Sequence, residues 1–204
     1  MSRTRSYLVR SEKQLAALTA AARQEVVDVL EQLGTVSIGE LAAALGRPAD
    51  ALYFHIRALT RVGLVRRTGF RSRPGGRGRH KEALYCTVAP ELKLHYEPHK
   101  ASNRKAVSAI VSSMLRLAMR DFRGAFQRDT VVVRGPRREL WGLRKVGRLS
   151  QAGLAEANRR IKGLERAVSA PGKRGRLYAI TVVLTPLDHR NKIESADKRK
   201  TKTK

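Results

Sequence analysis

Apolar residues recur every three or four positions between residues 15 and 33, the spacing of one face of an α-helix. The members of this stripe are Leu15, Leu18, Ala22, Val26, Val29, Leu30 and Leu33. The pattern predicts a helix over residues 12–33, ended by Gly34, because glycine readily adopts the left-handed conformation of a helix C-terminus. It leaves open whether Thr19 divides this segment into two helices.

Two shorter helices are predicted next, each with its own start and stop signals. Ser37 stands three residues before Glu40, the spacing of a capping box, and this predicts a helix that ends at Gly46. Pro48 suits the first turn of a further helix, which we expect over residues 48–62 with Gly63 as its stop.

The pattern then changes to short extended segments. Residues 64–67 and 83–88 predict two strands, and the basic stretch RRTGFRSRPGGRGRHK, residues 66–81, connects them. The glycines and Pro74 of this stretch favour a turn. The order of these segments is that of a winged helix-turn-helix, which we expect over residues 12–97.

The second half of the chain returns to a helical pattern. Apolar stripes predict helices over residues 102–126, with Ser102 as the N-cap, and over residues 150–169. Runs of β-prone residues predict strands at 130–134 and 177–184.

The predicted fold class is therefore α+β, a winged helix-turn-helix DNA-binding domain followed by a helical C-terminal region with a small β component. We expect the C-terminal domain to span residues 98–189. Residues 1–11 are expected to be a flexible basic N-terminus, and residues 190–204 a disordered basic tail.

Charge narrows the choice of partner. Forty-three Lys and Arg face 17 Asp and Glu, a formal net charge of +26. Such an excess favours a polyanionic partner, either nucleic acid or an anionic membrane. No apolar run approaches the ~20 residues that span a bilayer, so we expect double-stranded DNA as the partner and no membrane. Cys86 is the only cysteine, which agrees with a reducing compartment and a cytoplasmic, nucleoid-associated protein.

The helix at residues 48–62 has an outer face suited to the major groove of DNA. Its inner face is formed by Leu52, Ile56 and Leu59, and its outer face by Asp50, Tyr53, Phe54, Arg57 and Arg61. Arg57 is the best candidate for a bidentate contact with guanine, while Tyr53 and Phe54 could touch thymine methyl groups or sugar edges. Asp50 suits the helix N-terminus better than a base contact. The alternative is an ordinary solvated helix face.

The basic stretch at residues 66–81 predicts the wing, a hairpin tip beside this recognition helix. Its arginines can pair with phosphates or enter a narrow minor groove, and we expect the tip to be disordered until DNA binds. The alternative is a solvated loop without a role in binding. The predicted DNA contacts are Ser37, Arg47, Asp50, Tyr53, Phe54, Arg57, Arg61, Arg66, Arg71, Arg73, Arg77, Arg79 and Lys81.

The two later helices offer apolar stripes for a homodimer. In the second of them the stripe follows 3-4-3-4 spacing over about two heptads, as in a coiled-coil seam. The residues predicted for dimerisation are Val107, Ile110, Met114, Leu154, Ile161, Leu164 and Val168. The alternative is that both helices pack only on their own domain.

Residues 36–67, VSIGELAAALGRPADALYFHIRALTRVGLVRR, resemble the ArsR-type winged-helix regulators of bacteria. The likeness rests on ELAAALG and HIRALTRVGLV and extends over about residues 15–90. It implies a DNA-binding transcriptional regulator. Residues 47–51 depart from the Ser/Thr-rich helix start of that family. The family's metal sensors carry cysteine pairs, whereas this chain has a single thiol, so no thiolate metal site and no cofactor are expected.

Taken together, these patterns predict a sequence-specific regulator of transcription that binds double-stranded DNA and is not an enzyme. They do not identify an effector ligand. Two alternatives remain. A DNA-packaging protein with little sequence preference is favoured by the net charge and opposed by the aromatic outer face of the recognition helix. An RNA-binding winged-helix protein is the other.

Overall fold

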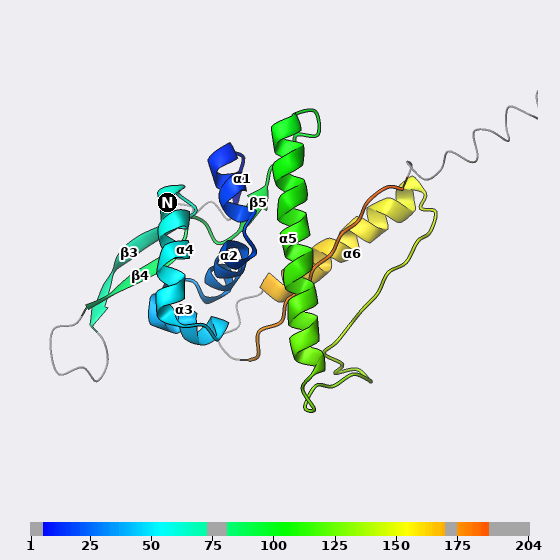
Figure 1. Ribbon diagram of the computed structural model, residues 1–204. Coiled ribbons are helices and arrows are strands. Elements are labelled where there is room, and N and C mark those ends of the chain that lie inside the picture. The colour runs from blue at the N-terminus through cyan, green and yellow to red at the C-terminus, as the bar shows by residue number, and fades with distance from the viewer. Residues whose placement is uncertain (1–5, 73–80, 170–174, 188–204) are drawn as a thin grey trace, which may run out of the picture.

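The computed structural model describes residues 6–72, 81–169 and 175–187 of the 204-residue chain. Its architecture is α+β, with a helix-turn-helix and a β-hairpin on one side of the molecule and the long helix α5 on the other (Figure 1). The predicted fold class is confirmed at this level.

The helix predicted over residues 12–33 is divided in two. α1 (Glu12–Leu18) and α2 (Ala21–Leu33) are separated at Thr19, whose Oγ1 donates a hydrogen bond to the carbonyl oxygen of Ala16 (2.8 Å). Ala20, which precedes α2, has an extended backbone. A threonine hydroxyl that bonds the preceding turn competes with the helical backbone pattern, and the chain changes direction here.

α3 (Ile38–Leu45) and α4 (Ala49–Arg61) form the helix-turn-helix. α3 ends at Gly46, whose φ of +61° lies in the left-handed region that glycine adopts at little cost. α4 starts one residue later than predicted, because Pro48 is extended and serves as its N-cap. The residues buried beneath the helices, each at most 1% exposed, include Leu15, Val26, Leu30, Leu41, Leu52, Leu59 and Leu64.

Two small sheets flank these helices. β2 (Val36–Ser37), β4 (Lys81–Thr87) and β3 (Val65–Ser72) form an antiparallel sheet in the order β2-β4-β3. The β3–β4 register shifts by one residue between Arg67 and Gly69, which is a β-bulge and increases the local twist of the hairpin.

The second sheet was not predicted from the sequence. β1 (Tyr7–Val9) pairs in parallel with β5 (Leu92–Leu94), and Val9 is only 1% exposed. Residues 7–9 therefore belong to the folded domain, contrary to the flexible N-terminus expected over residues 1–11.

α5 (Ala101–Phe126) packs along α1 and α2, and buried polar groups fix the contact. The Ser113 hydroxyl, 0% exposed, donates to the carbonyl oxygen of Thr19 (2.6 Å), and the Gln24 amide donates to that of Ile110 (3.0 Å). Lys100 precedes the helix as its N-cap, whereas Ser102, the predicted N-cap, lies inside it and donates to Glu12.

The region after α5 has one helix and no strand among its described residues. α6 (Gln151–Ser169) agrees with the predicted helix at 150–169. Residues 130–134 and 177–184, predicted as strands, pair with no strand, so the small β component expected in this region is absent from its described part. The tail predicted at 190–204 lies outside the described residues.

Candidate nucleic-acid interface

The outer face of α4 carries large side chains in the open. Phe54 is 71% exposed and Tyr53 52%, and Arg57 lies exposed one turn further along the helix. The inner face is formed by Leu52, Ile56 and Leu59, exposed by 1%, 3% and 0%. The buried and exposed residues of α4 are thus those that the sequence predicted for its inner and outer faces. Because the inner residues fix the rotation of α4 about its axis, the aromatic and basic residues point away from the domain.

The polar residues at the start of α4 differ in their availability. Asp50 is exposed in the first turn, where a negative charge is favourable next to the unpaired N–H groups. Arg47, in the preceding turn, is bound to Glu25 of α2, with 2.6 Å between its Nη2 and Glu25 Oε2. The DNA contact predicted for Arg47 therefore requires its side chain to leave Glu25.

Ser37 performs a structural role instead of the DNA contact predicted for it. Its side chain accepts a hydrogen bond from the backbone N–H of Glu40 (3.3 Å), and the Glu40 carboxylate accepts one from the N–H of Ser37 (2.8 Å). The predicted capping box is thus present. Ser37 is only 2% exposed, so its side chain has no free surface to offer DNA.

The β3–β4 hairpin places further positive charge beside α4. Arg66 and Arg67 are exposed on β3, and Lys81 is exposed at the start of β4. The guanidinium of Arg67 lies over the ring of Phe70, 5.0 Å from its centroid, which limits its freedom. Arg73, Arg77 and Arg79, predicted as the tip of the wing, lie outside the described residues.

Arg71 is neutralised within the protein. It forms ion pairs with Glu82 of β4 (2.6 Å) and with Glu40 of α3 (2.9 Å), and the bond to Glu82 raises the pKa of Arg71 above its usual value. Arg71 therefore ties the hairpin to α3. The contact with phosphate or the minor groove predicted for Arg71 would have to replace two carboxylates, so its contacts favour a structural role that ties the hairpin to α3.

Three arginines on and next to α4 have no acidic partner in the described part of the chain. Within residues 6–72, 81–169 and 175–187, no carboxylate lies within ion-pair distance of Arg57, Arg61 or Arg66, and all three side chains are exposed. Their charge is therefore open to solvent or to an external anion, and Arg57 and Arg61 follow Tyr53 at four-residue spacing on one face of α4.

Other kinds of site find little support in the described part of the chain. No group of three or more His, Cys, Asp or Glu side chains there could hold a metal ion. None of the described helices combines the length and the apolar character that crossing a bilayer requires. Cys86 is buried in β4.

Sequence reasoning missed the ion pairs of Glu25. This residue of α2 binds Arg47 and also Arg120 of α5, each at 2.6 Å. Charged residues far apart in the sequence give no local pattern that would predict such a contact.

A comparison of the sequence with known protein families supports the assignment of a helix-turn-helix. Residues 18–68 match the family model described as a helix-turn-helix domain, a segment that runs from the end of α1 into β3. The match covers about a quarter of the chain, and it leaves the ArsR resemblance a prediction. No curated protein matches the chain.

Proposed function

We propose that this protein is a regulator of transcription that binds double-stranded DNA with sequence preference and acts at the nucleoid in the cytoplasm. α4 would enter the major groove, and the β3–β4 hairpin would lie on the flanking phosphates or minor groove. The observation that carries the proposal is the outer face of α4, where Tyr53, Phe54 and Arg57 are exposed together and no part of the described chain covers them.

The chemistry of this face suits base edges. Arg57 can donate two hydrogen bonds to the O6 and N7 atoms of guanine, and an exposed aromatic ring can contact the methyl group of thymine. Phe54, at 71% exposure, leaves most of its ring in water in the free protein. Contact with DNA would remove that apolar surface from water, which is favourable.

The basic residues around α4 would supply affinity without sequence preference. Each phosphate that an arginine or lysine neutralises releases counterions, which makes binding weaken as salt rises, with a log–log slope of about 0.9 per contact. Arg61, Arg66 and Arg67 are the described candidates, with Lys81 at the other end of the hairpin. Replacing Arg66 and Arg67 with alanine should lower the slope by up to about 1.8 per protomer.

Selection of bound sequences from a random pool of duplex DNA tests the proposal. A regulator should return a motif and should prefer it over scrambled DNA by roughly 10³ or more. A packaging protein should return no motif and show no preference. An RNA-binding protein should bind duplex RNA at least as tightly as DNA, although the narrow major groove of A-form RNA excludes a recognition helix.

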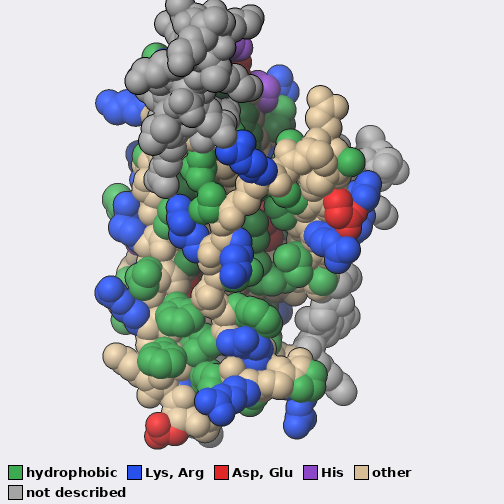
Figure 2. Space-filling model, turned by 90° about the vertical axis from the view of Figure 1, so that its right-hand side faces the viewer, with side chains coloured by type: hydrophobic (Ala, Val, Ile, Leu, Met, Phe, Trp, Pro, Cys, Tyr) green, Lys and Arg blue, Asp and Glu red, His purple; other side chains and the backbone are tan. Residues whose placement is uncertain are grey.

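We propose in addition that the protein binds DNA as a homodimer formed through its C-terminal half. α6 has no buried residue, and Leu154 and Leu164 on its apolar stripe are 44% and 48% exposed. A helix in water is stabilised mainly by packing its apolar face. Figure 2 shows hydrophobic side chains spread over the face that α6 belongs to, mixed with Lys and Arg.

The extended segments of this region support the same proposal. Residues 130–133 and 176–178 are held together by Glu139, whose carboxylate accepts hydrogen bonds from the N–H of Val132 (2.9 Å), the hydroxyl of Tyr178 (2.6 Å) and the guanidinium of Arg176 (2.6 Å). Ile180, Val182 and Val183 continue the second segment and are 45–52% exposed. Apolar extended chain without a strand partner is suited to pairing with a second copy.

The residues predicted for dimerisation on α5 divide into two groups. Val107 and Ile110 are 8% and 2% exposed and pack inside their own chain, as the alternative interpretation had it, so they offer almost no surface to a partner. Met114 is partly buried against the same core. The proposed interface on α5 therefore shifts to its last turns, where Met119 and Phe126 are 52% and 67% exposed.

A further inference from the structure

One carboxylate connects the turn before the recognition helix to α5. The Oε2 atom of Glu25 lies 2.6 Å from Nη2 of Arg47, and its Oε1 atom lies 2.6 Å from Nη2 of Arg120. The side chain of Glu25 is 15% exposed, whereas those of Arg47 and Arg120 are 32% and 46% exposed. Since Glu25 belongs to α2, the three side chains join α2, the α3–α4 turn and α5.

The two arginines share this acceptor unequally. Arg120 has a second partner, because it also donates to Asp121 on its own helix (2.6 and 2.9 Å). Arg47 has no other carboxylate within ion-pair distance in the described part of the chain. A carboxylate that serves two guanidinium groups holds each of them less strongly than it would hold one alone. How firmly Arg47 is held therefore depends on Arg120.

Charges of both signs surround Glu25, because its own charge and that of Asp121 add to burial in raising the pKa of Asp28 to about 6. Burial of the His55 ring, followed by the charges of Arg23 and Arg47, lowers the pKa of His55 on α4. The Nε atom of Arg23 is buried without a hydrogen-bond partner in the described structure. Within this mixed group, Glu25 is the carboxylate that binds both Arg47 and Arg120.

We propose that Glu25 and Arg120 are positioning residues for Arg47. Glu25 holds Arg47 back from the DNA phosphates in the free protein, and Arg120 loosens that hold by sharing the carboxylate. A movement of α5 changes how Glu25 is shared, so the C-terminal half of the chain tunes DNA affinity without touching DNA. This inference rests on the proposed function, since it takes Arg47 to be a phosphate contact.

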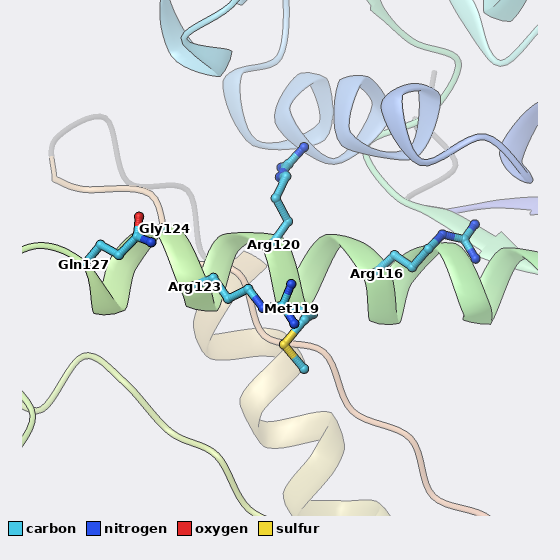
Figure 3. A pocket seen from close by; sticks show the side chains of 6 residues that line it. All are labelled: Arg116, Met119, Arg120, Arg123, Gly124 and Gln127. Atoms are coloured by element: carbon cyan, nitrogen blue, oxygen red, sulfur yellow. The ribbon is translucent and has the colours of Figure 1, made fainter.

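Arg123 provides a matched control on the same helix. Arg120 and Arg123 both line an open depression of about 450 Å³ on α5. Figure 3 shows Arg120 reaching toward α2, whereas the side chain of Arg123 lies along α5 beside Met119 and does not reach α2. No ion pair of Arg123 is present in the described structure. Arg123→Gln removes the same charge from the same helix and leaves Glu25 untouched.

The DNA test compares Arg120→Gln with Arg123→Gln in the full-length protein, by fluorescence anisotropy with a selected duplex over a range of salt. Arg120→Gln should weaken binding by up to roughly fivefold more than the control at 0.15 M salt and should lower the log–log slope by up to about 0.9, the share of one phosphate contact. Arg120→Lys should restore most of the loss, and Glu25→Gln should tighten binding.

The role of Arg47 is tested by repeating the comparison in an Arg47→Gln background, where the extra effect of Arg120→Gln should disappear. A merely structural role of Arg120 would lower the melting temperature and leave the salt slope unchanged. Equal effects of Arg120→Gln and Arg123→Gln would overturn the inference. An extra effect that persists without Arg47 would overturn it too.

Urea unfolding tests the shared carboxylate without DNA. If Glu25 is shared, removing one arginine strengthens the other pair, so the double variant Arg47→Gln/Arg120→Gln should lose more stability than the two single variants together. If the stability loss of the double variant equals the sum of the two single losses, the inference is rejected. The proposed function would still stand in that case, provided that the wild-type protein binds DNA. Non-additive losses in a protein that binds no DNA would reject the proposed function and the role of Arg47 as a phosphate contact.

Discussion

Replacing Arg57 with alanine should weaken binding to a selected duplex by about 1–3 kcal/mol, the worth of one good bidentate base contact. This corresponds to a rise in Kd of roughly 5- to 150-fold. Arg57 lies exposed one turn from Tyr53 and Phe54, and no carboxylate of the described chain competes for its guanidinium. The residues that hold α4 in the core are not touched, so we expect the melting temperature to stay the same.

The substitution Arg57→Lys separates base reading from charge. Lysine keeps the positive charge and loses the planar pair of donors that matches guanine. Anisotropy titrations of each variant on the selected and the scrambled duplex, at several salt concentrations, should show lost preference and an unchanged salt slope for Arg57→Lys. Equal losses on both duplexes for Arg57→Ala, with full recovery in Arg57→Lys, would identify a phosphate contact and refute the reasoning.

Three further predictions concern stability and assembly. Ser37→Ala removes the cap of α3 and should lower the free energy of unfolding by about 1 kcal/mol; an unchanged urea midpoint would contradict this. Burial raises the pKa of Glu31 to about 7, so the folded protein retains a proton that the unfolded chain, with a pKa near 4.5, has lost. The stability contributed by neutral Glu31 is therefore lost as pH rises from 5 to 8. Urea unfolding at pH 5 and pH 8 should show a smaller difference in stability for Glu31→Gln than for the wild type. An equal difference in the two proteins would contradict the proposed role of Glu31. Ile161→Asp should convert a dimer to a monomer in sedimentation, whereas Asn158→Asp, which adds the same charge beside the stripe, should not; a wild type that is already monomeric would reject the dimer.

The helix-turn-helix could be predicted because its signals are local. The capping box at Ser37, the glycines that end helices and the 3.6-residue period of α4 each act within a few residues, and each appears in the structure at or within one residue of its predicted place. The exposed outer face of α4 followed from the same period. Burial of Ser37 did not, because it depends on β2 pairing with β4, far along the chain.

What could not be predicted depends on contacts between distant residues. Two such contacts are the pairing of Tyr7–Val9 with Leu92–Leu94 and the ion pair between Arg120 and Glu25. Neither leaves a local sequence pattern from which the partner could be identified. At residues 130–134 and 177–184 the local sequence predicts strands that the described structure does not contain. Their β-prone composition is real, but a strand exists only where a neighbour supplies hydrogen bonds, and the described part of the chain supplies none.

The parallel pairing of β1 with β5 also sets the order in which the domain can form during synthesis. Tyr7 leaves the ribosome first, yet its partner Leu92 follows roughly 85 residues later. At about 5–20 residues per second the first strand waits on the order of 4 to 17 s for its neighbour. The helices between them can form in that interval, since their contacts are local. The backbone of β1 has no strand partner until β5 emerges, and Ile110 of α5, which belongs to the same hydrophobic core as Val9, follows later still.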